Sequence, residues 1–316
     1  MSMGIFVSIA SYCDPVLPFT LERAAAMASD PAGLHFGVVD QSPAGSPRPF
    51  LPTGGARLSQ VQLDVADARG PCWARAIAMS LYDGEAWFLQ LDSHMDFDPG
   101  WDERLVAQAQ ELGAPARDLV LTTYPDAFRF VDGQPVRQPT ASGVLAQVLR
   151  PGTTFATDHP VLSFEAQPVQ SSVALPAFHV GAGCLFAPGR IAQQLPYDPW
   201  LYFHGEEQAY ALRLYTHGWD LFHVPGLPIH HLYNDPGSGA PPRPLHWDAA
   251  HDALRQTGWW SLEQRSRARL AALVAGEDLG VYGLGSARTL AAYADFCGID
   301  YAARTLAPRA FTPRLP

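Results

Sequence analysis

The sequence contains no lysine. All 21 basic residues are arginines, and with 31 acids the formal net charge is −10. This balance disfavours broad binding to nucleic acids or anionic membranes, because both need a basic surface. An anionic ligand would have to be held by a local group of arginines or by a metal ion.

Cysteines and long apolar runs are also scarce. The four cysteines (Cys13, Cys72, Cys184 and Cys297) lie far apart without a C-x-x-C pair, so we expect free thiols rather than a zinc ribbon or a disulfide scaffold. The N-terminal run GIFVSIA lacks a basic flank and is soon followed by Asp14, unlike a signal peptide or a membrane span. No other segment reaches the length of a bilayer crossing, so we expect a soluble cytoplasmic protein.

What the sequence does contain is an alternation of strand-like and helix-like segments. It is 316 residues long and 47% hydrophobic, enough for a substantial core. Strands are expected over 4–10, 34–41, 57–65, 86–92 and 118–124, with helices over about 18–29, 71–83 and 101–113. A loop rich in proline, glycine and serine covers 42–55. The alternation predicts an α/β protein with a mostly parallel sheet covered on both faces.

The second half is less regular. The pattern is weak over 126–180 and returns with FHVGAGCLFAP (178–188). We expect a helix over about 205–217, a strand over 219–226, a strand end within 228–235 and a flexible loop over 234–244. Helices are expected over about 245–256, 261–275 and 286–297.

Two side chains able to bind a metal follow the buried strand 86–92, in LQLDSHMDF. In an extended chain Asp92 and His94 share a face, and Ser93 points away. Ligands of open α/β sheets bind beyond the carboxyl ends of strands, and a carboxylate with an imidazole suits Mn²⁺. A third ligand could come from His230 or His231. The alternative is an aspartate that caps a strand end beside a surface histidine.

Six motifs in this order resemble glycosyltransferase family 60, the polypeptide α-N-acetylglucosaminyltransferases. They are SIASYCDP, ARGPCWAR, LQLDSHMDF, FHVGAGCLFA, FHGEEQAYALRLYTHGWD and HHLY. The resemblance extends to YGLGSARTLAAYADFCGID and is weakest over 42–60 and 126–176. It implies a GT-A fold, with a Rossmann-like mixed central sheet flanked by helices. The catalytic domain would span 1–240, with a nucleotide-binding half (1–125) and an acceptor half (126–240). A C-terminal helical segment (241–316) would pack on the same domain.

The resemblance also implies a chemistry. Asp92 and His94 correspond to its D-x-D-type metal motif, and His231 in HHLY would be the third ligand of Mn²⁺ or Mg²⁺. The donor would be UDP-GlcNAc, transferred with retention of the α configuration. The acceptor would be a hydroxyl, either of Ser, Thr or hydroxyproline in a polypeptide or of a saccharide. Another UDP-sugar remains an alternative donor, and the sequence does not indicate an oligomeric state.

The residues expected to contact the donor come from several segments. They are Ser8, Ala10, Ser11, Asp40, Gln41, Arg69, Arg75, Asp92, Ser93, Gly181 and Gly183. The first five end strands where a nucleoside would dock. The two arginines would contact phosphates or fix the Asp92 strand, and the glycines would allow close backbone approach. Each of these residues also has a structural alternative. The arginines could form ion pairs, Asp40 could be a cap, and the glycines could form a tight turn.

Two acids, Glu206 and Glu207, open the helix expected at 205–217. The helix dipole favours acids there for structural reasons. The resemblance places them near the donor sugar and acceptor, where either could orient the acceptor hydroxyl, and no enzyme nucleophile is assigned. His179 could line the pocket, and Trp200 and Tyr202 are acceptor-side candidates, while Trp219 is expected in the core.

Three other functional classes compete with a transferase. A metal-dependent hydrolase could use the same ligands, but neither H-E-x-x-H nor H-x-H occurs. A non-catalytic binding module would bind without turnover. An NAD-linked enzyme is disfavoured, because the first strand leads into SYCDP instead of a G-x-G-x-x-G turn.

Overall fold

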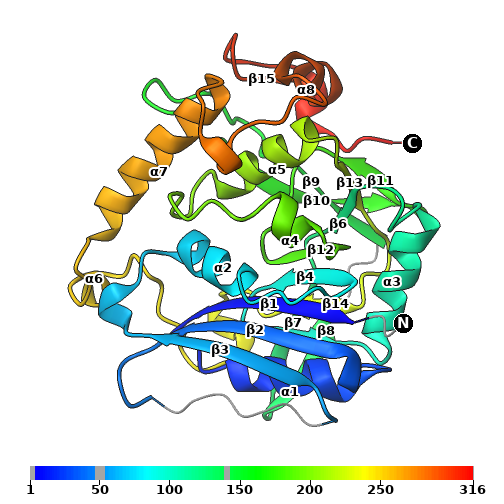
Figure 1. Ribbon diagram of the computed structural model, residues 1–316, viewed down its shortest axis with the longest axis vertical. Helices are drawn as coiled ribbons and strands as arrows, with labels where there is room; N and C mark the ends of the chain where they lie inside the picture. Colours follow the sequence, from blue (N-terminus) through cyan, green and yellow to red (C-terminus); the bar gives the residue numbers. More distant parts are fainter. Residues whose placement is uncertain (1–3, 47–53, 139–142, 316) are drawn as a thin grey trace.

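One large sheet runs through the centre of the molecule in the computed structural model, which describes residues 4–46, 54–138 and 143–315 (Figure 1). Part of the expected loop 42–55, residues 47–53, lies outside the described residues. The strands of the sheet are β1 (Ile5–Tyr12), β2 (Leu34–Gln41), β3 (Arg57–Leu63), β4 (Trp87–Leu91), β6 (Leu119–Thr122), β11 (Leu175–Ala177), β12 (Cys184–Pro188) and β13 (Asp220–His223). Their spatial order is β11-β13-β6-β12-β4-β1-β2-β3.

The strand directions are mixed, which confirms the mixed central sheet implied by the family resemblance, whereas the mostly parallel sheet expected from the alternation alone is wrong around β12 and β11. Strands β3, β2, β1 and β4 run parallel to one another. Strand β12 lies antiparallel between β4 and β6, and β11 is antiparallel to β13. The chain reaches β12 from β6 through a series of further strands, and not through a single crossover helix, so it can return in the opposite direction.

Helices cover both faces of this sheet, as expected. Alternate residues of the central strands face opposite sides. Ile5, Val7 and Ile9 pack with α1 (Leu17–Met27) and α3 (Trp101–Glu111). Phe6 and Phe88 pack on the other face with α2 (Pro71–Met79), α4 (Ile191–Gln194), α5 (Glu206–Thr216) and α7 (Trp259–Val274). All eight residues of β2 are buried, as a central strand covered on both sides requires.

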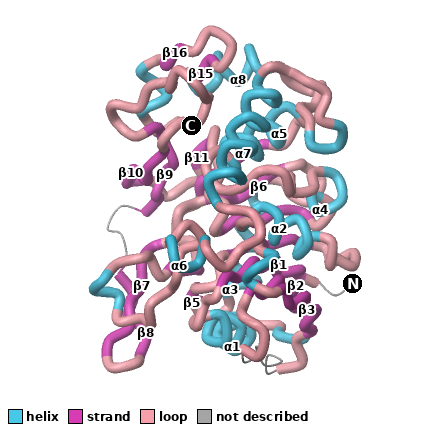
Figure 2. Tube along the Cα trace, turned by 90° about the vertical axis from the view of Figure 1, so that its left-hand side faces the viewer, coloured by secondary structure: helices cyan, strands magenta, loops and turns pink. Residues whose placement is uncertain are grey.

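The region of weak sequence pattern, 126–180, contributes strands, although residues 139–142 are outside the described part. A four-stranded sheet has the order β5 (Met95–Phe97), β14 (Ile229–His231), β7 (Asp126–Val131) and β8 (Gln134–Gln138). The β7–β8 hairpin projects from one end of the molecule (Figure 2). A separate antiparallel pair joins β9 (Gly143–Leu149) to β10 (Phe164–Gln170).

The last third of the chain carries α7 and α8 (Leu290–Cys297), both in contact with α5. Strands β15 (Ile299–Asp300) and β16 (Thr305–Leu306) form a short pair. The helix expected over 245–256 is wrong for most of its length, because only α6 (Ala249–Asp252) is helical. Tertiary contacts hold its flanks instead, including a hydrogen bond between His246 and the Tyr202 hydroxyl. Across the described residues, we find no helix with both the length and the apolar character of a membrane span.

Candidate active site

A cavity of about 630 Å³ opens beside the C-terminal ends of β1 and β4. Parallel strands place the residues that follow them at a common sheet edge, where ligands of such folds bind. The wall of the cavity combines charged, imidazole and aromatic side chains. The polar ones include Tyr12, Asp14, Arg75, Asp92, Ser93, His94, Tyr124, Arg150, His179, Glu206, Glu207, His231, Arg243 and His246.

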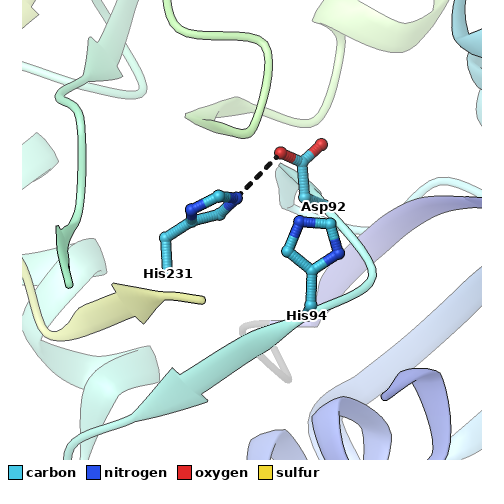
Figure 3. A group of neighbouring side chains, drawn as sticks. All are labelled: Asp92, His94 and His231. Carbon is cyan, nitrogen blue, oxygen red and sulfur yellow. Dashed lines mark ion pairs between the residues drawn. The ribbon is translucent and has the colours of Figure 1, made fainter. Parts of the chain in front are cut away.

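Asp92, His94 and His231, here called the triad, meet in this wall (Figure 3). Asp92 and His94 follow β4 in a bend that leads into β5. They therefore do not lie in the extended chain that was expected when the two side chains were placed on one face. His231 ends β14, which pairs antiparallel with β5 and puts His231 opposite Met95. Two distant segments of the sequence are thereby joined at one point.

The geometry of the triad fits a divalent metal ion. One ligand atom from each residue lies within 4.8 Å of the others, and His231 Nε2 is 3.3 Å from Asp92 Oδ2. Burial acts to raise the pKa of Asp92, but the His231 hydrogen bond and the Arg75 charge hold it well below its usual range. Burial lowers the pKa of His231, which favours the neutral imidazole that metals bind. One carboxylate and two imidazoles suit Mn²⁺ and related ions.

A second acid, Asp14, orients the His94 ring of the triad. Its Oδ2 lies 2.6 Å from His94 Nδ1 and accepts a hydrogen bond of 2.6 Å from the Ser93 hydroxyl. A carboxylate on one imidazole nitrogen fixes the ring and leaves the other nitrogen for a metal. Burial acts to raise the pKa of Asp14, but these hydrogen bonds hold it below its ordinary value, so it stays ionised. No role was predicted for Asp14, which lies within the motif SYCDP.

The strand pleat separates the two adjacent histidines of β14. His231 faces Asp92, whereas His230 points to the other side, where its Nε2 is 3.1 Å from Asp98 Oδ1. Alternation along a strand therefore decides which of the two can join the triad.

Beneath the triad lies a buried ion pair between Arg75 and Glu206. The guanidinium donates to both Glu206 oxygens at 2.7 and 2.8 Å, and to Asp92 Oδ1 at 3.0 Å. Glu206 also accepts from the Cys72 thiol at 2.8 Å and the Tyr197 hydroxyl at 3.2 Å. Burial acts to lower the pKa of Arg75, but the Glu206 carboxylate keeps it well above its ordinary value. Arg75 thus fixes the Asp92 strand end, one of the two roles considered for it.

The neighbouring acid, Glu207, is placed differently. Its side chain is 30% exposed, against 5% for Glu206. One oxygen accepts a hydrogen bond of 2.8 Å from the Ala182 N–H, and the other lies 3.5 Å from His179 Nε2. Of the two acids that open α5, only Glu207 therefore has a carboxylate partly free to meet a ligand.

The other residues expected at the donor divide into two groups. Ala10, Ser93 and Gly183 line the cavity, and a side chain at Gly183 would come within 2.5 Å of Asp92 Oδ2. The remaining six do not line it: Ser8, Ser11, Asp40, Gln41, Arg69 and Gly181.

These six are placed by their own local contacts. Asp40 accepts from the Ser42 hydroxyl at 2.7 Å, as a turn acid does, and the Gly181 N–H donates to Thr122 Oγ1. Ser8 and Ser11 are buried in β1. Arg69, which precedes α2, lines a separate cavity, so the structure does not support the expectation that it contacts donor phosphates here.

Several cavity residues escaped the sequence analysis. Arg243 donates to the Leu232 carbonyl at 2.7 Å and lies near the charges of Asp14 and Asp92. It sits in NDPGSGAPPRP, which reads only as a flexible loop. His246 and Trp247 follow it, with ring centroids 4.5 Å apart, and cover one side of the cavity. No spacing rule connects this loop to the triad, although Arg243 is the single basic residue in that motif.

Comparison with solved structures identifies the fold. A structure of GalNAc-T7 with UDP, GalNAc and Mn²⁺ matches with a TM-score of 0.58 at 13% identity, covering 93% of this chain and 54% of that one. The chain thus spans a little over half the length of that protein. S. aureus TarS (residues 1–349) matches with a TM-score of 0.42 at 13% identity, covering 70% of this chain and 60% of that one. The similarity to GalNAc-T7 shows the GT-A fold.

Sequence comparison identifies the family. No curated protein matches the chain by sequence. The model of the family described as Glycosyltransferase (GlcNAc) matches residues 48–303, a range that includes the triad, Arg75 and both acids of α5. This match covers most of the sequence and agrees with the resemblance carried by the six motifs. The chain therefore belongs to the Glycosyltransferase (GlcNAc) family.

Proposed function

We propose that the protein is a metal-dependent, retaining glycosyltransferase that moves GlcNAc from UDP-GlcNAc to a hydroxyl acceptor. The observation that carries the proposal is the triad, which joins two distant segments into one ligand set in the wall of the large cavity. Family membership supports the sugar, and the UDP and Mn²⁺ bound by GalNAc-T7 support the donor class and the metal.

The residues around the triad divide the work of holding the donor. Asp92, His94 and His231 would hold a divalent cation, which neutralises the diphosphate and stabilises the UDP leaving group. Arg75 fixes Asp92 from below, and Asp14 fixes the His94 ring. The guanidinium of Arg243 stands at the same wall, where it would add positive charge for the phosphates.

Glu207 is the acid suited to the acceptor side. Its partly exposed carboxylate would accept a hydrogen bond from the sugar or the acceptor hydroxyl and orient it. Glu206 is committed to Arg75, so it acts on the site by position. We assign no enzyme nucleophile: in a front-side displacement the acceptor oxygen bonds to the anomeric carbon as the bond to UDP breaks. The leaving phosphate then takes the acceptor proton.

The acceptor and the compartment belong to the same proposal. We propose a polypeptide acceptor with Ser, Thr or hydroxyproline, since the motifs resemble polypeptide transferases. A cytoplasmic location is consistent with four cysteines that are all free thiols.

A donor screen tests the proposal. The protein is mixed with Mn²⁺ and a series of UDP-sugars, and mass spectrometry follows UDP release and sugar transfer to Ser, Thr and hydroxyproline peptides. UDP-GlcNAc should be used best, and EDTA should stop the reaction. Failure to bind or turn over any UDP-sugar, with hydrolysis of simple esters instead, would establish the hydrolase alternative.

A further inference from the structure

A second cavity, of about 430 Å³, is formed by the start of α2, the loop 199–202 and one face of α7. It shares no lining residue with the first cavity. Its lining consists of Arg69, Trp73, Pro199, Trp200, Leu201, Tyr202, Thr257, Leu262, Arg265 and Arg269.

The charge of this second cavity has one sign. Three arginines line it and no acid does, in a chain whose net charge is −10. Arg269 is paired with Asp198 at 2.8 Å. Arg69 and Arg265 form no ion pair with any residue in the described part of the chain. Two guanidinium groups are thus available to bind carboxylates, for which their planar geometry is suited.

Aromatic surface accompanies these arginines. The Arg69 guanidinium lies 5.5 Å from the centre of the Trp73 ring, which holds it over an apolar platform. Trp200 is 64% exposed, an unusual state for so large an apolar side chain. Arginine and tryptophan are among the residues that contribute most to binding at protein interfaces. A ligand with acidic groups next to apolar side chains would complement this surface.

The second cavity adjoins the first through consecutive residues. Tyr202 lines the second cavity, and Phe203 and His204 line the first. The Tyr202 hydroxyl bonds to His246, which also lines the first cavity. The linings of the two cavities are therefore continuous along the chain at Tyr202 and Phe203, which places the cavities side by side.

We propose that the second cavity binds an acidic segment of the acceptor polypeptide, which holds a hydroxyl-bearing residue at the first cavity. Arg69 and Arg265 bind the carboxylates, and Trp73 and Trp200 pack on the neighbouring side chains. This rests on the proposed transferase function, and it gives that function a sequence preference that the triad alone does not supply.

The test uses two labelled peptides of equal length, each with one Thr. They differ only in a flank of three Glu or three Gln residues. Fluorescence anisotropy measures binding to the intact protein, and mass spectrometry measures GlcNAc transfer with Mn²⁺. The wild type should bind the Glu peptide about tenfold more tightly, since every ~1.4 kcal/mol changes affinity tenfold and each charge-assisted bond contributes on that order. The double substitution Arg69→Gln, Arg265→Gln should remove that preference.

A matched double substitution, Arg129→Gln with Arg314→Gln, removes the same charge from residues that line neither cavity and should keep the preference. UDP-GlcNAc hydrolysis without peptide should be the same in all three proteins. If donor use is normal but the two peptides bind equally or not at all, the inference is overturned. The inference is also overturned if both double variants behave alike, or if the second cavity binds free citrate or phosphate but not the Glu peptide. If no UDP-sugar is used but the preference for the Glu peptide still depends on Arg69 and Arg265, the transferase proposal fails. The second cavity then stands as a binding site for acidic peptides.

Discussion

The triad and the buried ion pair are two charged clusters that share Asp92 but differ in what they leave unfilled. In the ion pair, Glu206 has an arginine, a thiol and a phenol as partners, and its side chain is only 5% exposed. In the triad, Asp92 is 29% exposed and His231 Nδ1 has no hydrogen-bond partner in the described structure. A buried carboxylate whose oxygens are held by protein partners fixes geometry, whereas a partly exposed carboxylate beside imidazoles can bind something else.

The same difference separates the two adjacent acids of α5. Both belong to the first turn, where the helix dipole favours negative charge. Glu206 turns into the ion pair and Glu207 into the cavity wall. Neighbouring residues of identical chemistry therefore support the site in one case and expose a carboxylate to the cavity in the other.

Asp92 belongs to both clusters, and its replacement should have the largest effect. The substitution Asp92→Asn keeps the side-chain shape but removes the charge from the metal ligand. We expect donor turnover to fall by roughly 10³-fold or more, because a bound metal supplies several kcal/mol of transition-state stabilisation. UDP release from UDP-GlcNAc in Mn²⁺ measures this. Unchanged turnover in a folded variant would remove Asp92 from the mechanism.

Replacing the two acids of α5 separates support from ligand contact. Glu206→Gln leaves the Arg75 charge buried without its main partner, and we expect a loss of about 3–5 kcal/mol in the free energy of unfolding. Glu207→Gln keeps an oxygen for the Ala182 N–H, so its unfolding free energy should change by less than about 1 kcal/mol while transfer falls. Urea unfolding and transfer assays on both variants decide. Equal stabilities would show that the ion pair does not fix the site.

The two histidines of β14 provide a matched pair for the triad. His231→Ala removes a ligand and should weaken Mn²⁺ binding by roughly 100-fold, since even partners of metal ligands cost 10–100-fold when removed. His230→Ala removes the contact to Asp98 on the opposite side and should leave Mn²⁺ affinity close to that of the wild type. Calorimetric titration of Mn²⁺ in the presence of UDP measures both. A larger loss for His230→Ala would reverse the assignment.

A buried histidine outside both clusters should give the smallest effect. Burial lowers the pKa of His223 from 6.5 to about 4. On acidification the unfolded chain therefore takes up this proton before the folded protein does. The free energy of unfolding is at its full value above about pH 6.5, and it decreases as the pH falls toward 4. Between about pH 7.5 and about pH 6 the loss should be about 0.8 kcal/mol. Urea unfolding should show a shallower pH slope for His223→Gln, and an unchanged slope would contradict the lowered pKa.

Much of the structure of the first 125 residues could be predicted from sequence, because its signals are local. The buried strands at 34–41 and 86–92 are rich in apolar residues. Pro71 marks the start of α2, and the acids of the first turn mark the start of α3. The triad needed more than local signals. Periodicity placed Asp92 after a strand, but the choice of His231 came from the family resemblance.

The parts that sequence did not predict depend on tertiary contacts. The direction of β12 follows from the path of the chain through the strands after β6, which no periodicity encodes. Asp14 and Arg243 reach the cavity only because the loops that carry them fold back on the triad. Arg69 and Arg75 belong to one motif, yet they line different cavities, one before α2 and one within it.

Anomalous X-ray scattering from crystals grown with Mn²⁺ and UDP would locate the metal ion itself. We expect one manganese peak within bonding distance of Asp92, His94 and His231, with UDP phosphate oxygens completing its coordination. A manganese ion bound elsewhere, or UDP bound in the cavity with no metal at the triad, would contradict it.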